Sequence, residues 1–161
     1  MKNLKLVESV PVIGSLRIII RDAKTGKIKS VDEVKNLITD GARNSWADHA
    51  RGTTENNKGI ITYCAVGTDS TAPVASNTTL GTEIERKLVS TREISSGADN
   101  AAVFTTFFNT SEANGALKEV GLFGDDAAVA ADSGTMFTHA AIDRTKSTAD
   151  TLTIEYTVII G

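Results

Sequence analysis

Two histidines and one cysteine are the side chains of this sequence best suited to act as a general base or a nucleophile. His49 lies beside Asp48 at the end of a predicted short helix, where an imidazolium interacts favourably with the helix dipole. His139 lies in the predicted strand "MFTHAAI" and is expected to be half-buried with its hydrogen bonds satisfied. Cys64 follows Tyr63 in another predicted strand and is expected to be a small core residue. None of the three is predicted to be catalytic.

Two pairs of carboxylates come close together in the sequence. Glu83 and Glu85 share one face of a predicted strand, but a glycoside hydrolase also needs a cleft with stacking aromatic rings, and only 5% of this chain is aromatic. Asp125 and Asp126 fall in a loop that lacks the alternating ligands of an EF-hand. We interpret both pairs as solvated charges.

Sequence motifs for catalysis or cofactor binding are also missing. No G-x-S-x-G element positions a nucleophile, and "GTDST" (67–71) lacks the G-K-[ST] ending of a phosphate loop. One cysteine with two histidines does not supply a structural zinc site. The sequence therefore predicts a protein that is not an enzyme and has no catalytic, cofactor-binding or metal-binding residues.

Composition restricts the classes of partner. The 17 basic and 20 acidic residues are spread along the chain and give a net charge of −3, so no basic field is available for nucleic acid or an anionic membrane. No apolar run approaches the roughly 20 residues that cross a bilayer. The opening residues lack the continuous apolar segment of a signal peptide, which predicts synthesis in the cytoplasm.

Short alternating segments rich in Thr and Ser predict β structure along most of the chain. Strands are predicted at residues 15–22, 27–31, 60–67, 83–91, 102–109, 116–123, 135–142 and 151–160. The last strand has the clearest pattern, with one face formed by Leu152, Ile154, Tyr156, Val158 and Ile160. A single helix is predicted over 41–51, with Asp40 as its N-cap, Gly52 after its end and Trp46 packed against a sheet.

These elements predict an all-β fold: an antiparallel β-sandwich or jelly-roll-like domain over residues 15–161, with one short helix and an extended N-terminal arm over 1–14. The arm carries apolar residues in alternation: Leu4, Leu6, Val10 and Val12. Such an arm could lie across a neighbouring subunit or form an ordinary first strand of its own chain, and the sequence leaves both open.

The order of five segments is more informative than any single residue. They are "KNLITDGA" (35–42), "ITYCAVGTDSTAPVASNTTLGTEIERK" (61–87), "FFNTSEANGALKEVGLFG" (107–124), "GTMFTHAAI" (134–142) and "KSTADTLTIEYTVII" (146–160). In this order they resemble a widespread family of tailed-bacteriophage structural proteins over residues 14–161. The family's T-x-L-x-x-E-x-x-R, E-x-G-L-F and K-T-x-x-D-T-L-T patterns are matched by Thr79, Leu80, Glu83 and Arg86, by Glu119, Gly121, Leu122 and Phe123, and by Lys146, Asp150, Thr151, Leu152 and Thr153, with Ser147 replacing a threonine.

The resemblance implies a virion structural protein without catalytic activity. We favour a capsid decoration (cement) protein, a homotrimer or other homo-oligomer that binds major capsid or tail proteins, because an apolar arm and a small β-domain suit interlocking subunits. A tail fibre, baseplate or collar adaptor protein is the alternative. A carbohydrate-binding module ranks below both because most of the eight aromatic residues are predicted to face inward, and a hydrolase ranks lowest.

The run "ALKEVGLFG" (116–124) raises a structural question, because Lys118 and Glu119 interrupt an otherwise apolar strand. The family pattern contains both Arg86 and Glu119, so we predict a buried or half-buried bridge between these two residues that ties two strands together. Trp46, Leu122 and Phe123 are the predicted core anchors.

Overall fold

The structure, a computed structural model, describes residues 11–52, 57–97 and 100–160. This part of the chain forms nine strands and one helix: β1 (Val12–Asp22), β2 (Ile28–Ile38), α1 (Asp40–Ala50), β3 (Ile61–Gly67), β4 (Glu83–Leu88), β5 (Thr91–Ile94), β6 (Ala101–Phe108), β7 (Gly115–Gly124), β8 (Thr135–Lys146) and β9 (Asp150–Ile160). The predicted all-β fold with one short helix is confirmed.

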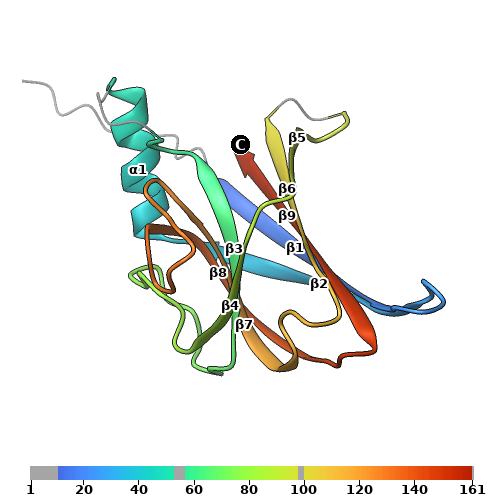
Figure 1. Cartoon of the computed structure of the whole chain (residues 1–161). Coiled ribbons are helices and arrows are strands. Elements are labelled where there is room, and N and C mark those ends of the chain that lie inside the picture. Colours follow the sequence, from blue (N-terminus) through green and yellow to red (C-terminus); the bar gives the residue numbers. More distant parts are fainter. Residues whose placement is uncertain (1–10, 53–56, 98–99, 161) are drawn as a thin grey trace, which may run out of the picture.

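All neighbouring strands run antiparallel and form a single sheet in the order β4-β3-β7-β8-β2-β1-β9-β6-β5. The sheet curls on itself, so that β3, β7 and β8 face β1, β9 and β6 in a sandwich-like arrangement (Figure 1). β2 joins the two halves: residues 28–36 pair with β1, whereas only Leu37 and Ile38 pair with β8.

The two edge strands of the sheet follow each other in the chain, which nearly closes the curl. A single strand was expected over 83–91, but the chain crosses between the two halves at Val89 and Ser90. The N–H of Val89 donates to the carbonyl of Thr62 in β3 at 2.9 Å, and the next N–H, of Ser90, donates to the carbonyl of Thr105 in β6 at 2.7 Å. Two consecutive residues therefore hydrogen-bond to the two halves of the sheet, next to its two edges.

The main core lies between the two halves of the sheet and contains apolar side chains from both. Four side chains on the predicted apolar face of β9 are buried in it: Leu152, Ile154, Tyr156 and Val158. Ile160, at the end of that face, is instead exposed. Alternation alone thus identified the central strand of one half, because one of its faces is covered along most of its length.

The opposite face of β3, β7 and β8 is also covered, by two long loops at residues 68–82 and 125–134. A second, smaller cluster forms there from Ala65, Leu80, Phe123 and Met136. Figure 1 shows both loops on the side of β3 that faces away from β1 and β9. These strands are therefore buried on both faces, which explains why their sequences are nearly continuous in apolar residues.

The first strand begins earlier than the sequence indicated. Val12 pairs with Ile160 and Gly14 with both Val158 and Asn36, so these residues, assigned to the arm, belong to the sheet. A Cβ at Gly14 would lie 2.0 Å from Oδ1 of Asn36, so a larger residue at this position would displace the Asn36 side chain.

β2 extends to Ile38, beyond the predicted 27–31. The prediction was too short because charged residues in the second half of the strand interrupt the alternating pattern. Asp32 lies opposite the buried Ile18 of β1 and forms an ion pair with Arg144 of β8. This pair spans the part of the sheet where β2 and β8 no longer hydrogen-bond. Charges at an unpaired strand edge oppose the addition of another strand.

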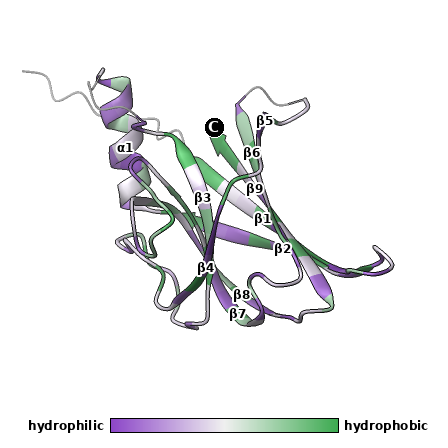
Figure 2. Cartoon of the chain, viewed as in Figure 1, coloured by the Kyte–Doolittle hydropathy of each residue, from purple (hydrophilic) through white to green (hydrophobic). Residues whose placement is uncertain are grey.

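Helix α1 begins one residue before the predicted start, and its N-cap is Thr39 and not Asp40. The Thr39 hydroxyl accepts a hydrogen bond from the N–H of Ala42 at 3.2 Å, while Asp40 pairs with Arg43 in the first turn. Only Ala42 and Ser45 are buried within the helix, and Figure 2 shows it mainly in hydrophilic colours. The helix therefore covers the end of the sheet with a narrow contact face.

Candidate functional site

Glu119 of β7 holds the 68–82 loop against the sheet. Its side chain is only 2% exposed. Oε1 accepts hydrogen bonds from the N–H groups of Thr82 at 2.8 Å and Asp69 at 3.3 Å, and Oε2 accepts one from the N–H of Gly81 at 2.9 Å. One buried carboxylate thus satisfies backbone donors at both ends of a loop that has no secondary structure of its own.

His139 of β8 adds a second attachment for the same loop. Its Nε2 lies 3.1 Å from Oε2 of Glu119, and its Nδ1 lies 2.9 Å from Oδ1 of Asn77. That Asn77 oxygen also accepts the N–H of Val74 at 2.8 Å, so both ring nitrogens face acceptors. These groups border a polar cavity of about 160 Å³.

Two glycines allow the loop to approach the carboxylate this closely. A Cβ at Gly67 would lie 2.4 Å from Oε1 of Glu119, and one at Gly81 would lie 1.9 Å from Oδ2 of Asp69. The "AVGT" and "LGT" segments are the sequence signal for this site, because a glycine after a strand can mark close backbone approach. Sequence reasoning missed their relation to Glu119.

Arg86 of β4 holds the other loop, at 125–134. Its guanidinium makes two parallel hydrogen bonds to Glu83, at 2.7 and 2.8 Å, and both side chains are at most 3% exposed. Nη1 donates to the carbonyl of Ser133 at 2.8 Å and to its hydroxyl at 3.0 Å. The guanidinium carbon lies 4.3 Å from the centroid of the Phe123 ring, within range of a cation–π interaction.

The predicted bridge between Arg86 and Glu119 is therefore wrong. The two residues lie on strands on opposite sides of β3, with Arg86 opposite Ala65 and Glu119 opposite Gly67. Arg86 finds its carboxylate three residues away on its own strand, and Glu119 is satisfied by loop N–H groups and His139. Each residue fixes one loop on the same face of the sheet.

A register shift explains the mixed pattern of "ALKEVGLFG". The pairing of β7 with β8 shifts between Leu117 and Glu119, and Leu117 lies in the same core cluster as Val120 and Leu122. Lys118 pairs with the exposed Asp143 of β8. Strict alternation from Leu117 onwards therefore assigns side chains to the wrong faces.

The other side chains considered for catalysis or metal binding are Cys64, His49 and Asp125. Burial raises the pKa of the Cys64 thiol to about 12, so it stays protonated in the core as expected. His49 is exposed on α1. Asp125 and the side chain of Glu83 are buried, so the interpretation of both carboxylate pairs as solvated charges is wrong for these two residues. Oδ1 of Asp125 accepts hydrogen bonds from the Ser45 hydroxyl at 2.6 Å and the N–H of Gly59 at 2.9 Å. That carboxylate attaches α1 to the end of β7.

Of the predicted core anchors, Leu122 and Phe123 are fully buried, on opposite faces of β7. Trp46 is half-buried: its ring packs edge-on against Phe137 at 5.4 Å, and its Nε1 donates to the carbonyl of Gly59 at 3.3 Å. Among the predicted arm residues, Val12 lies in β1, and Leu4, Leu6 and Val10 fall outside the described residues.

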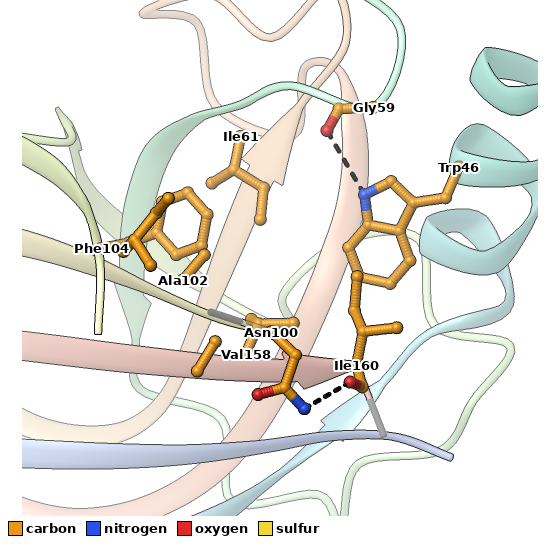
Figure 3. A pocket seen from close by; sticks show the side chains of 10 residues that line it. Trp46, Gly59, Ile61, Asn100, Ala102, Phe104, Val158 and Ile160 are labelled. Atoms are coloured by element: carbon orange, nitrogen blue, oxygen red, sulfur yellow. Dashed lines mark hydrogen bonds between the residues drawn. The ribbon is translucent and has the colours of Figure 1, made fainter. Parts of the chain in front are cut away.

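An apolar pocket of about 280 Å³ opens at the end of the sandwich that carries α1. We call it the mouth pocket; it is lined by Trp46, Gly59, Ile61, Ile94, Asn100, Ala101, Ala102, Phe104, Val158 and Ile160. Figure 3 shows Trp46 and Ile160 on one side and Phe104 and Ile61 on the other. The side-chain amide of Asn100 already donates to the carbonyl of Ile160 at 2.7 Å. The lining therefore presents mainly apolar surface.

At the other end of the sandwich, Asp150 at the start of β9 is strongly held in its charged form. The Lys29 ammonium, 2.5 Å from Oδ1, and the Ser147 hydroxyl, 2.6 Å from Oδ2, lower the pKa of Asp150 from 3.8 to about 2. Because this pKa is depressed by folding, the carboxylate stabilises the fold above about pH 4, and that contribution is lost as the pH falls towards 2.

We therefore expect Asp150→Asn to lower stability at pH 7 and to bring the variant close to the unsubstituted protein near pH 2. Urea midpoints at pH 7, 4 and 2 measure this difference. Asp143→Asn is the control, because Asp143 is lowered in pKa by Lys118 but lies at the surface, where its contribution is small. Parallel pH profiles for the Asp150→Asn variant and the unsubstituted protein would contradict the assignment.

Comparisons with protein-family models, with curated proteins and with solved structures each found no match. Within residues 11–52, 57–97 and 100–160, no group of three His, Cys, Asp or Glu side chains is placed to hold a metal ion. In the same ranges no helix is long and apolar enough to span a membrane. The candidate functional features are thus the 68–82 and 125–134 loops, which buried side chains hold against the sheet, and the mouth pocket.

Proposed function

We propose that this chain is a non-enzymatic structural protein of a tailed-bacteriophage virion, made in the bacterial cytoplasm and incorporated as a capsid decoration protein. The observation that carries an assembly role is the apolar surface at the α1 end of the sandwich. Ile94 is 71% exposed and Ile160 is 56% exposed beside the mouth pocket. Exposed apolar side chains grouped around a pocket are typical of protein-protein contact sites.

The way the buried charges are used also supports a structural role. Glu119 and His139 fix one loop, and Arg86 and Glu83 fix the other. Both groups make the surface formed by the loops more rigid, and their hydrogen bonds are used within the chain. Rigid surfaces lose little conformational entropy on binding, which favours stable contacts between subunits.

The phage assignment rests on the resemblance of five ordered segments, and the decoration role on the apolar arm and the single small domain. The partners of this proposal are further copies of the chain and the major capsid or tail proteins. A tail fibre, baseplate or collar adaptor uses the same surfaces, and it differs in where the protein lies on the particle.

The proposal is tested with the full chain and a form lacking residues 1–10, which retains every described strand. Both are added to purified particles stripped of the protein, and occupancy is measured after sedimentation. We expect the truncated form to fold, by circular dichroism, and to bind at least tenfold less. A chain whose first ten residues are scrambled controls for length and charge. Equal occupancy of all three forms would contradict a role for the arm, and absence of full-length protein from heads and tails would contradict the virion assignment.

A further inference from the structure

The mouth pocket has the shape and polarity of a receptor for aliphatic side chains. Among the described residues no charged side chain lines it, and the one polar side chain there, of Asn100, is paired within the chain. Its volume of about 280 Å³ lies just below the roughly 300–1,000 Å³ of pockets that take drug-sized ligands. A few side chains of leucine or valine size would fill it and remove Ile94 and Ile160 from water.

An open strand edge borders the pocket. In the described part of the chain, β5 is the last strand of the sheet and pairs only with β6, and all four of its residues are exposed. An extended segment laid along this edge would gain backbone hydrogen bonds and direct every second side chain to one face. The occupant suggested by the pocket is therefore an extended segment with alternating apolar residues.

We propose that the mouth pocket binds residues 1–10 of a second copy of this chain, with Leu4 and Leu6 as the inserted side chains. When extended, the segment "MKNLKLVESV" places Leu4, Leu6, Glu8 and Val10 on one face and Asn3, Lys5, Val7 and Ser9 on the other, so Leu4 and Leu6 form the apolar pair of the first face. This proposal rests on the proposed function only in requiring that subunits meet.

Chain geometry favours a second copy over the chain's own arm. Val12 pairs with Ile160, which itself lines the pocket, whereas Leu6 lies six residues away, about 20 Å in extended chain at ~3.3 Å per residue. Filling its own pocket would require the chain to reverse within those residues. Pro11 favours an extended Val10, which opposes a turn directly before β1.

Disulfide trapping shows whether the mouth pocket binds the arm of a second copy or the arm of its own chain. One chain carries Leu6→Cys and another carries Ile94→Cys; Cys64 is fully buried in both and stays inert. Mixed under mild oxidation, these chains are expected to form a disulfide-linked pair. A Lys5→Cys chain, whose cysteine lies on the opposite face of the extended arm, is expected to link to Ile94→Cys at least fivefold less.

A second measurement uses Trp46, which lines the pocket and is the single tryptophan of the sequence. A synthetic peptide of residues 1–12 is titrated into the chain lacking residues 1–10, and a saturable change in tryptophan emission is expected. The same peptide with Leu4→Ser and Leu6→Ser is expected to bind at least tenfold more weakly.

Cross-linking only when both cysteines are in one chain would overturn the proposal in favour of the chain's own arm. No cross-link together with no change in Trp46 emission would overturn it altogether. Arm exchange by a protein that is absent from virions would refute the proposed function and leave this inference intact. Loss of particle binding on arm deletion without trapping at Ile94 would support the proposed function and refute this inference.

Discussion

Replacing Glu119 with alanine is expected to destabilise the fold by about 3–5 kcal/mol, because several buried hydrogen-bonding groups lose their partner at once. The substitution deprives the N–H groups of Gly81, Thr82 and Asp69 of their acceptor and leaves His139 without its carboxylate. Each buried donor left unsatisfied costs about 1–3 kcal/mol, and partial release of the 68–82 loop to water limits the total.

The adjacent residue supplies a matched control for this substitution. Lys118→Ala removes a charge from the same strand, but Lys118 pairs with the exposed Asp143, so we expect a loss of at most about 1 kcal/mol. Glu119→Gln is expected to lie between the two, because a glutamine offers one acceptor oxygen and turns an amide group towards the remaining N–H donors.

Chemical denaturation measures these changes, and hydrogen exchange localises them. In the unsubstituted protein the amides of Gly81 and Thr82 are expected to be protected, and in Glu119→Ala they are expected to exchange at rates close to those of exposed loops. A variant that stays within about 1 kcal/mol of the unsubstituted protein and keeps both amides protected would show that the loop is held by other contacts.

Periodic patterns in the sequence were sufficient for the elements whose surroundings are uniform along their length. β9 shows this best: the buried side chains of Leu152, Ile154 and Tyr156 follow strict alternation because one face of the strand is covered along most of its length. The helix was also recognisable, although its cap was placed one residue late, because Thr39 and Asp40 are both good N-cap residues.

Elements whose surroundings change along the chain were predicted less well. β4 and β5 look like one strand in the sequence, and only the curl of the sheet separates them at Val89 and Ser90. In β2, the charges that guard its open edge, such as Asp32, obscured the alternation. Neither feature can be recognised before the order of the strands is known.

The partners of the buried charges were not predictable for a related reason. Glu119 is bound largely by N–H groups of a loop that runs from the neighbouring strand β3 to β4, and every residue type except proline carries such a donor. The pattern from which the bridge was predicted contains both Arg86 and Glu119, and both residues are buried. It could not show that two residues important to the same face serve two different loops.

Arg86→Ala is expected to destabilise the fold by about 3–5 kcal/mol, because it leaves the Glu83 carboxylate buried without its cation. The 125–134 loop would also lose the guanidinium that donates to Ser133 and covers the Phe123 ring. Arg86→Lys is expected to recover only part of this loss, since an ammonium keeps the charge but cannot reproduce the two parallel hydrogen bonds to Glu83.

Double-mutant cycles distinguish this arrangement from the bridge suggested by the sequence. Alanine substitutions at Arg86 and Glu83 are expected to show a coupling of about 2–3 kcal/mol, because both remove the same buried pair. Substitutions at Arg86 and Glu119 share no hydrogen-bond partner and are expected to add to within about 0.5 kcal/mol. If Arg86 coupled strongly to Glu119 and weakly to Glu83, the two loops would have to open and close together. Near-additivity with Glu119 means instead that each loop can open while the other stays closed.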